Sequence, residues 1–196
     1  MRWPGTAAKC RRSRAMRRSI GPVLIGGIAA AGLMAFATYR LLGRHPVGNP
    51  NVPEPAKAVH LDEYLGRWFE IARYEQRFER GCDAATADYT RLPDSRIRVI
   101  NRCLKRDGKI DEVTGIATVV DAGTNAKLKV RFFGPFYGDY WILDHADDYS
   151  WSIVGEPTGR YLWILSRQSE PANVEELVSR VSAMGYDVSM LVYDRH

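Results

Sequence analysis

The sequence predicts an all-β body, an eight-stranded antiparallel up-and-down β-barrel with a C-terminal α-helix, preceded by an N-terminal membrane segment. Three observations support this fold class. Short segments rich in Val, Ile, Tyr, Phe and Trp recur between turn sequences from residue 66 to residue 166. The hydrophobic period then changes to that of a helix. Near the N-terminus, a long uncharged run follows a cluster of basic residues.

Charge is divided unevenly along the chain. The 196 residues include 28 Lys or Arg and 23 Asp or Glu, a net charge of +5. Residues 1–60 hold ten of the basic residues and a single acid, Glu54, so this segment carries +9 and residues 61–196 carry −4. The body is therefore mildly acidic, and no nucleic-acid partner is expected. Its length of about 135 residues suits one domain with one core.

The N-terminal segment is predicted to reach a membrane. Residues 1–18 form a basic arm with seven positive charges, and residues 19–39 are 21 residues without a charge. About 20 apolar residues match the hydrocarbon thickness of a bilayer, and preceding positive charge holds the N-terminus in the cytoplasm. The run is long enough for a transmembrane anchor, and Ala35-Phe36-Ala37 also offers a signal-cleavage site. Either way, the body is expected beyond the cytoplasmic membrane.

Residues 40–59 are predicted to be an extended linker, and residues 60–196 the folded domain. Four prolines lie between His45 and Val59, and such a composition favours an extended chain. The domain boundary is therefore placed at residue 60.

Eight strands are predicted between residues 66 and 166. Turn sequences such as Asp107-Gly108 and Gly134-Pro135 separate them. Residues 127–132 alternate strictly between charged and apolar side chains, as a strand with one buried face does. The strands are expected near residues 66–74, 85–92, 96–104, 112–120, 126–133, 138–145, 149–155 and 160–166. Eight such strands can close a barrel that has room for one small ligand.

The C-terminal helix is indicated by four apolar residues at helical spacing, namely Val174, Leu177, Val178 and Val181. Ser169 is expected as its N-cap, Pro171 in its first turn and Gly185 at its C-cap. The apolar run Val188–Tyr193 is expected to end the chain as a strand.

Three short motifs stand at the ends of the predicted strands. Gly66-Arg67-Trp68 opens the first strand, Gly138-Asp139-Tyr140 opens the sixth, and Arg167 follows the eighth. Two longer blocks are RFERG at 77–81 and FFGPFYG at 132–138. Together they resemble the lipocalins, in particular the bacterial outer-membrane-lipoprotein branch related to apolipoprotein D and the plant temperature-induced lipocalins. Gly138 stands where the family carries Thr, and the resemblance covers residues 60–196.

The resemblance implies a calyx closed at one end by Gly66, Trp68 and Arg167. The Arg167 guanidinium would stack on the indole, a cation–π contact that contributes about 0.5–2 kcal/mol. These three residues are interpreted as structural residues that close the barrel and do not bind ligand.

Side-chain alternation along the strands predicts the residues that face the lumen. The charged face of the fifth strand must lie outside, so Leu128, Val130 and Phe132 point inward. By similarity to lipocalin strand registers, the other expected ligand-binding residues are Ala87, Tyr89, Val99, Asn101, Ala117, Tyr140, Ile142, Tyr161 and Trp163. This set has no Lys or Arg that would bind a phosphate. Glu70 shares the parity of Trp68 and should also point inward, bonded to a lumenal tyrosine or near the mouth.

An apolar, aromatic lumen favours a long-chain lipid. The expected function is the binding or transport of a fatty acid or, by the resemblance, a lysophospholipid in the bacterial envelope, during maintenance or stress. The barrel would stay anchored in the periplasm or be exported after cleavage. The structural alternative is a barrel filled by its own side chains.

No catalytic residue, cofactor or metal is expected. The histidines of the body, His60, His145 and His196, share no metal-ligand spacing, and no nucleophile motif is present. Two other functions stay open: a lipocalin-fold enzyme acting on a lipid, and an envelope protein–protein interaction module. Phe133, Phe136, Tyr137 and Trp141 are expected to be exposed and could serve such a contact, or a homodimer as in the bacterial branch. The loop from Glu75 to Ala84 could be a lid over the mouth or a solvated loop.

Cys82 and Cys103 are predicted to form a disulfide. The turn at Pro93-Asp94 places them almost opposite each other on the second and third strands. An exported protein meets an oxidising compartment, whereas Cys10 would remain in the cytoplasm and reduced.

Overall fold

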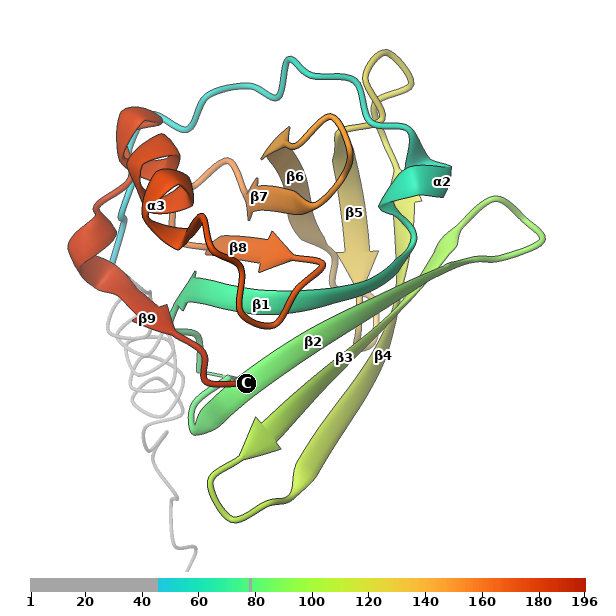
Figure 1. Ribbon diagram of the computed structural model, residues 1–196. Coiled ribbons are helices and arrows are strands. Elements are labelled where there is room, and N and C mark those ends of the chain that lie inside the picture. Colours follow the sequence, from blue (N-terminus) through green and yellow to red (C-terminus); the bar gives the residue numbers. More distant parts are fainter. Residues whose placement is uncertain (1–45, 78) are drawn as a thin grey trace, which may run out of the picture. The chain divides into compact units, whose positions relative to one another are not determined.

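The computed structural model describes residues 46–77 and 79–196. Within this part of the chain, strands β1–β8 form an antiparallel barrel that is closed because β1 pairs with both β2 and β8 (Figure 1). A further short strand, β9, pairs with the last residues of β1. The predicted eight-stranded barrel with a C-terminal helix is confirmed.

The predicted basic arm, the uncharged run at 19–39 and residues 40–45 lie outside the described residues. In the described ranges, no helix has the length and apolar character needed to cross a bilayer.

The strands lie where the sequence predicts them, with the largest shift, three residues, at the start of β2. Their bounds are β1 (Gly66–Tyr74), β2 (Cys82–Arg91), β3 (Ile97–Lys105), β4 (Ile110–Val119), β5 (Lys127–Arg131), β6 (Gly138–His145), β7 (Trp151–Gly155), β8 (Leu162–Ser166) and β9 (Leu191–Tyr193). A single helical turn, α2 (Leu61–Tyr64), precedes β1.

The C-terminal helix, α3, spans Val174–Ala183 and starts later than predicted. Asn173 is its N-cap, so the expectation that Ser169 caps the helix and that Pro171 lies in its first turn is wrong. Arg167 is still held by the sheet, since its N–H donates to Ser150 O. The residues after it are therefore needed to bring the chain to the outer face of the barrel.

The last apolar run forms two elements where one strand was expected. Val188–Met190 is a short 3₁₀ helix, η1, and only Leu191–Tyr193 pairs with β1. The Asp187 side chain accepts the N–H of Ser189 and so stabilises the turn in place of a strand.

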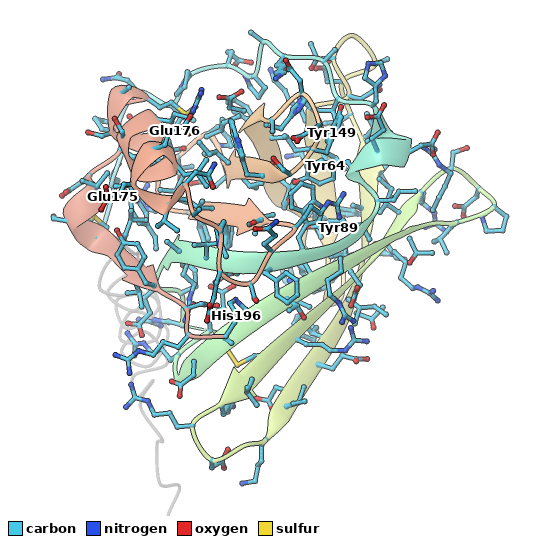
Figure 2. The ribbon with its side chains drawn as sticks, in the orientation of Figure 1. Tyr64, Tyr89, Tyr149, Glu175, Glu176 and His196 are labelled. Atoms are coloured by element: carbon cyan, nitrogen blue, oxygen red, sulfur yellow. A yellow bond between two sulfur atoms is a disulfide. The ribbon has the colours of Figure 1, made fainter. Side chains whose placement is uncertain are left out.

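Two apolar clusters hold the described fold together. One fills the inside of the barrel, and the other lies between the outer face of β1, β6, β7 and β8 and helix α3. Leu177 and Val181 of α3 are fully buried there, while Glu175 and Glu176 lie on its exposed side (Figure 2). The helix is thus held by one apolar face, as its periodicity predicts.

The segment from residue 46 to residue 59 lies against the domain. Gly48 N and Asn49 N donate to Gly159 O, and Val59 N donates to Thr124 O. Gly159 has a φ of +65°, and a Cβ there would lie 1.7 Å from Asn49 O, so only glycine fits this contact. The folded body therefore begins before residue 60, with much of the proline-rich segment as part of it.

The predicted disulfide between Cys82 and Cys103 is confirmed, with the two Cα atoms 5.3 Å apart. The bond runs diagonally, because Cys103 lies opposite Ala85 and Cys82 opposite Lys105, with an irregularity in β2 between Cys82 and Ala84. It joins β2 to β3 at the end of the barrel where the loop from β1 enters.

Candidate functional site

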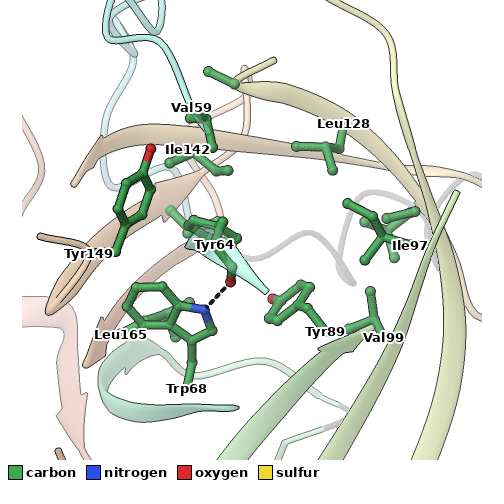
Figure 3. Packing of buried hydrophobic residues seen from close by; sticks show 14 residues of the cluster. Val59, Tyr64, Trp68, Tyr89, Ile97, Val99, Leu128, Ile142, Tyr149 and Leu165 are labelled. Atoms are coloured by element: carbon green, nitrogen blue, oxygen red, sulfur yellow. Dashed lines mark hydrogen bonds between the residues drawn. The ribbon is translucent and has the colours of Figure 1, made fainter. Parts of the chain in front are cut away.

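The closed end of the barrel is built around Trp68. Its side chain is fully buried, and its Nε1 donates to Tyr64 O at 2.8 Å (Figure 3). The Arg167 guanidinium lies over the indole, 3.7 Å from the ring centroid. The same guanidinium donates to the backbone oxygens of Glu63, Leu65 and Arg67 at 2.6–2.9 Å. One side chain thus ties the end of β8 to the start of β1.

The backbone conformation at residue 66 requires glycine. Its φ of +94° is in the left-handed region, which favours glycine. A Cβ at this position would make only an ordinary contact with Arg167 Nη1, at 3.5 Å. The Gly-x-Trp motif therefore has a local physical reason: glycine turns the chain into β1 beneath the arginine that covers the tryptophan.

The lower half of the lumen is closely packed. Six of the residues predicted to face inward are at most 7% exposed, namely Tyr89, Val99, Ala117, Leu128, Val130 and Ile142. They belong to the inner cluster with Trp68. This layer forms an apolar floor.

The upper half of the lumen is more open. Ala87, Phe132, Tyr140 and Trp163 are half-buried and pack on the inner cluster. Asn101 lies on the same inner face, because it pairs directly with Ala87. The Tyr161 ring stacks on Trp163, with centroids 5.8 Å apart. A ligand entering the barrel would meet Phe132, Tyr161 and Trp163 first, whereas Ala87 pairs with Trp68 and the Tyr140 hydroxyl belongs to the floor.

A chain of buried hydroxyl groups crosses the floor. Tyr89 Oη lies 2.8 Å from Tyr140 Oη, which lies 3.0 Å from Tyr64 Oη, and Tyr64 Oη lies 3.2 Å from Ser152 Oγ. Burial raises the pKa of Tyr64 to about 12 and the pKa values of Tyr89 and Tyr140 well above the ordinary range. These phenols are therefore neutral hydrogen-bonding groups. Their hydrogen bonds fix the side chains of the floor without placing a charge there.

Near the mouth, β1 places a charged side chain inside the barrel. An irregularity between Glu70 and Ala72 shifts the pairing of β1 with β8, so Glu70 lies opposite Leu165 and Arg73 opposite Trp163. Leu165 and Trp163 belong to the inner cluster, whereas Ile71, Ala72 and Tyr74 pack in the outer cluster under α3. Both Glu70 and Arg73 therefore face inward, on either side of the bulge.

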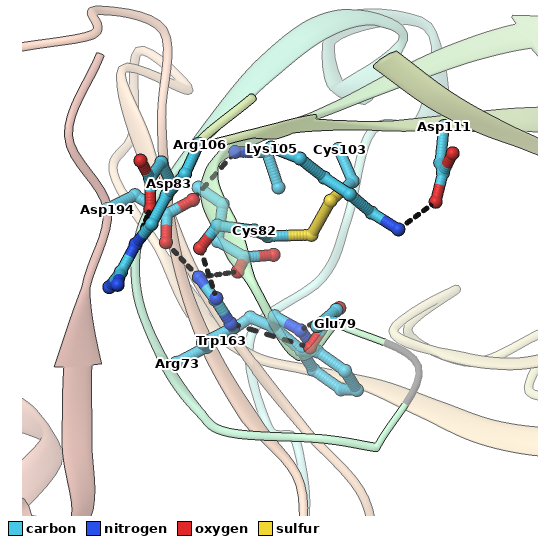
Figure 4. The surroundings of a disulfide bond; sticks show 12 residues. Arg73, Glu79, Cys82, Asp83, Cys103, Lys105, Arg106, Asp111, Trp163 and Asp194 are labelled. Atoms are coloured by element: carbon cyan, nitrogen blue, oxygen red, sulfur yellow. Dashed lines mark hydrogen bonds and ion pairs between the residues drawn. A yellow bond between two sulfur atoms is a disulfide. The ribbon is translucent and has the colours of Figure 1, made fainter. Parts of the chain in front are cut away.

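Three carboxylates surround Arg73. Its Nη1 lies 3.0 Å from Glu70 Oε1 and forms a close ion pair with Asp194, and its Nε lies 3.7 Å from Glu79 Oε2 (Figure 4). Its Nη2 also donates to Cys82 O at 3.1 Å. Glu70, Arg73, Glu79 and Asp194 are called the mouth cluster below. Loop, strand and C-terminal tail meet at this one guanidinium.

Burial controls the protonation of the mouth cluster. Desolvation raises the pKa of Glu70 to about 7, against the opposing effect of Arg73. Desolvation and the neighbouring Glu70 charge raise the pKa of Glu79 well above its usual range. The cluster therefore holds protons near neutral pH that an unfolded chain would release.

Of the two positions expected for Glu70, the structure has the one near the mouth, where it is paired with Arg73 and not with a tyrosine. Arg73, which the predicted set did not include, also faces inward, with its charge held by carboxylates. Strict alternation from Trp68 would put Arg73 outside, and nothing in the sequence marks the bulge that brings it in. Asp194 was missed because it reaches Arg73 across 121 positions of sequence.

The surface aromatic residues behave differently from one another. Phe133, Phe136 and Tyr137 are 73%, 79% and 57% exposed, as expected. Trp141, however, packs on the outer cluster, with Lys127 Nζ 4.7 Å from its ring centroid, so the expectation that it is exposed is wrong.

The loop after β1 is shorter than predicted, because Cys82–Ala84 belong to β2. Phe78, which was expected in this loop, lies outside the described residues.

The matching family model is the lipocalin-like domain, and it covers residues 59–196. The chain belongs to the lipocalin family. It is 40% identical over 150 residues to the outer membrane lipoprotein Blc of Escherichia coli K12, a match that covers 72% of this chain and 85% of that protein. It is 39% identical over 150 residues to temperature-induced lipocalin-1 of Arabidopsis thaliana, which covers 70% of this chain and 80% of the relative.

The fold is also shared with solved lipocalin structures. Insecticyanin from the tobacco hornworm Manduca sexta superposes with a TM-score of 0.62 at 22% identity, covering 78% of this chain and 88% of that chain. Lipocalins are typically proteins that bind small hydrophobic ligands. In the described part of this lipocalin, no three His, Cys, Asp or Glu side chains come together as metal ligands.

The closed end can be tested by substitution of Trp68. Trp68→Ala should lower the free energy of unfolding by about 3–5 kcal/mol, because it leaves a large cavity and an uncovered Arg167. Arg167→Lys should have a smaller effect in the same direction, because lysine keeps the charge but loses the planar stack and the fork of donors. Chemical denaturation measures both. Near-wild-type stability of Trp68→Ala would contradict the role given to the closed end.

The mouth cluster predicts a pH dependence of stability. A folded-state pKa raised above the unfolded value means that stability is highest below the unfolded pKa and falls as the pH rises. Glu70 is such a group, since its pKa moves from 4.5 to about 7, so the free energy of unfolding should fall as the pH rises through this window. One such group contributes up to about 1.4 kcal/mol per pH unit.

Glu79→Gln should flatten this dependence between pH 5 and pH 8, because the amide removes one buried charge and its repulsion of Glu70. Glu75→Gln is the matched control, since Glu75 is exposed on the same loop. Denaturation midpoints across the pH range provide the measurement. If the denaturation midpoints of wild type and Glu79→Gln change with pH in the same way, the cluster does not control the pH dependence of stability.

Proposed function

We propose that this lipocalin binds a single-chain lipid, a fatty acid or a lysophospholipid, with its acyl chain in the barrel. The observation that carries the proposal is the division of the inner face into a packed apolar floor and a half-buried layer above it. An acyl chain can replace water against the upper layer, and each buried methylene contributes about 0.8 kcal/mol before entropy costs.

The residues that would contact the lipid belong to the upper layer of the predicted set. We place the chain against Ala87, Asn101, Phe132, Tyr140, Tyr161 and Trp163. Tyr89, Val99, Ala117, Leu128, Val130 and Ile142 would form the floor at its end. The polar end would then lie near the mouth cluster.

The proposed location is the bacterial envelope, where the protein would carry or sequester lipid during membrane maintenance or stress. Two features support it: the uncharged run at 19–39 behind a basic arm, and the relatives named outer membrane lipoproteins. The disulfide is in keeping with an oxidising compartment. The barrel would lie in the periplasm, anchored by the run or released from it.

An interaction module is the second candidate, and one observation favours it. Phe133, Phe136 and Tyr137 form an exposed aromatic group between β5 and β6. Exposed aromatic side chains close together are typical of protein contacts, including a homodimer. Concentration-dependent self-association without any lipid binding would favour this function over the carrier.

The carrier function predicts that filling the lumen weakens lipid binding. Ala87→Phe should reduce the affinity for a palmitoyl lysophospholipid about tenfold or more, because the ring displaces part of the acyl chain and the loss of about two buried methylenes is enough for that change. Quenching of tryptophan fluorescence reports the titration, and native mass spectrometry of the purified protein identifies any lipid already bound.

Thr118→Phe is the matched control, because Thr118 is exposed and stands next to the inward-facing Ala117. Its affinity should equal that of the wild type, and thermal unfolding checks that both variants are folded. Equal affinities for all three proteins would contradict a ligand site in the upper lumen.

A further inference from the structure

The outer face of strands β3 and β4 carries aliphatic side chains where the outside of an antiparallel sheet is usually polar. Alternation with the inner cluster places four of them there, namely Ile100, Leu104, Ile110 and Ile116. Leu104 and Ile110 pair directly with each other and are 40% and 63% exposed. Helix α3 packs over β1, β6, β7 and β8 and lies away from β3, β4 and β5 (Figure 1). The helix therefore leaves this apolar face uncovered.

Five basic side chains share the outer face of β3–β5, namely Arg98, Arg102, Lys127, Lys129 and Arg131. A single acid, Glu112, lies among them, so the face carries +4, whereas residues 61–196 together carry −4. Ile116 pairs with Arg98 on one side and with Arg131 on the other, and neither arginine forms an ion pair with a described carboxylate. The face is therefore both basic and apolar.

The loop between β5 and β6 extends this face with aromatic rings. Phe136 N donates to Phe133 O at 3.4 Å, so the two phenylalanines stand at the ends of one β-turn. Gly134, inside the turn, has a φ of +50°, a conformation that favours glycine. The ring of Tyr137 lies beside Arg131, whose Cζ is 5.6 Å from the ring centroid. All three rings are exposed, and we call residues 133–137 the aromatic turn.

We propose that the outer face of β3–β5 and the aromatic turn together dock the barrel on an anionic lipid surface. Aromatic side chains are enriched at the headgroup level of membranes, and each basic side chain near an anionic surface contributes about 1 kcal/mol. The turn lies at the end of the barrel opposite Trp68, so docking would bring the mouth close to the membrane.

The charge of this face favours a lipid surface over a second copy of the chain. Two copies that met through it would each bring +4 to the contact, and like charges brought together oppose association. An anionic membrane supplies the opposite charge together with an apolar layer for the rings. The inference concerns the outside of the barrel and goes beyond the lipid held inside it.

The test follows the aromatic turn while the full chain is in a membrane. Cys10→Ser leaves only the two disulfide-bonded cysteines, and Phe136→Cys then supplies one thiol for the polarity-sensitive dye nitrobenzoxadiazole. Glu175→Cys, on the exposed side of α3, carries the same dye as the control position. Both chains are reconstituted in vesicles of phosphatidylcholine, alone or mixed in equal parts with phosphatidylglycerol.

The measurement is the rate at which dithionite reduces the dye. Chains that face the vesicle interior protect both positions alike, so the ratio of the two rates reports the position of the turn. With phosphatidylglycerol, the dye at residue 136 should be reduced about tenfold more slowly than the dye at residue 175 and should emit at shorter wavelength. High salt should remove most of this protection, because it screens the charges of the face.

Removal of one charge tests the basic face separately from the turn. Arg98→Gln in the chain labelled at residue 136 should lower the protection about fivefold, the factor that corresponds to about 1 kcal/mol. Arg180→Gln is the matched control, because Arg180 is exposed on α3, on the other side of the barrel, and it should leave the protection unchanged. Thermal unfolding checks that each chain is folded, and Phe133→Cys is the second labelling position if Phe136→Cys is not.

Three results would overturn the docking surface. Equal rates at residues 136 and 175 in anionic vesicles would show that the turn stays in water. Equal protection with and without phosphatidylglycerol would show that the basic face plays no part. Protection without vesicles that grows with protein concentration would show a contact between copies. Each of these leaves the lipid carrier standing, since titration with a lysophospholipid measures that function separately.

Discussion

The contact between Trp68 and Arg167 is the interaction on which the barrel depends. Trp68 fills the closed end, and its burial is complete only because the Arg167 guanidinium covers the indole at 3.7 Å. A lysine could not replace this arginine, because the guanidinium donates to three backbone oxygens of the segment that leads into β1. The start of the barrel and the end of its last strand are thereby fixed to each other.

This closure determines what the rest of the lumen can do. With one end sealed and the lower half packed by small and branched side chains, the accessible inner surface lies above the floor. The hydroxyl chain from Tyr89 to Ser152 satisfies the polar atoms of the floor internally, so an acyl chain that reaches it meets no unpaired group there.

At the mouth, one bulge in β1 determines which charged side chains lie inside the barrel. It turns Arg73 inward beside Glu70 while Ile71, Ala72 and Tyr74 stay under α3. The C-terminal tail then brings Asp194 to Arg73, and the loop after β1 brings Glu79. A buried site with three carboxylates and one guanidinium is costly, and protons lower that cost. The same carboxylates therefore make the stability of the fold depend on pH.

The sequence by itself determined the strand order, the closed end and the disulfide. Those features depend on patterns that are local in the sequence, namely hydrophobic period, turn residues and short motifs. Gly66, Trp68 and Arg167 mark the closed end. The turn at Pro93-Asp94 places Cys82 near Cys103. The inward positions of β5 followed from its alternation alone.

Only the tertiary structure decided the mouth. A single extra residue in β1 reverses the parity of every position after it, so Arg73 faces inward against the pattern of the sequence. Asp194 joins it through a contact between the chain's C-terminal tail and its first strand, which no local pattern encodes. Alternation describes one strand at a time, whereas the charge inside this barrel is set by where a loop, a bulge and a tail converge.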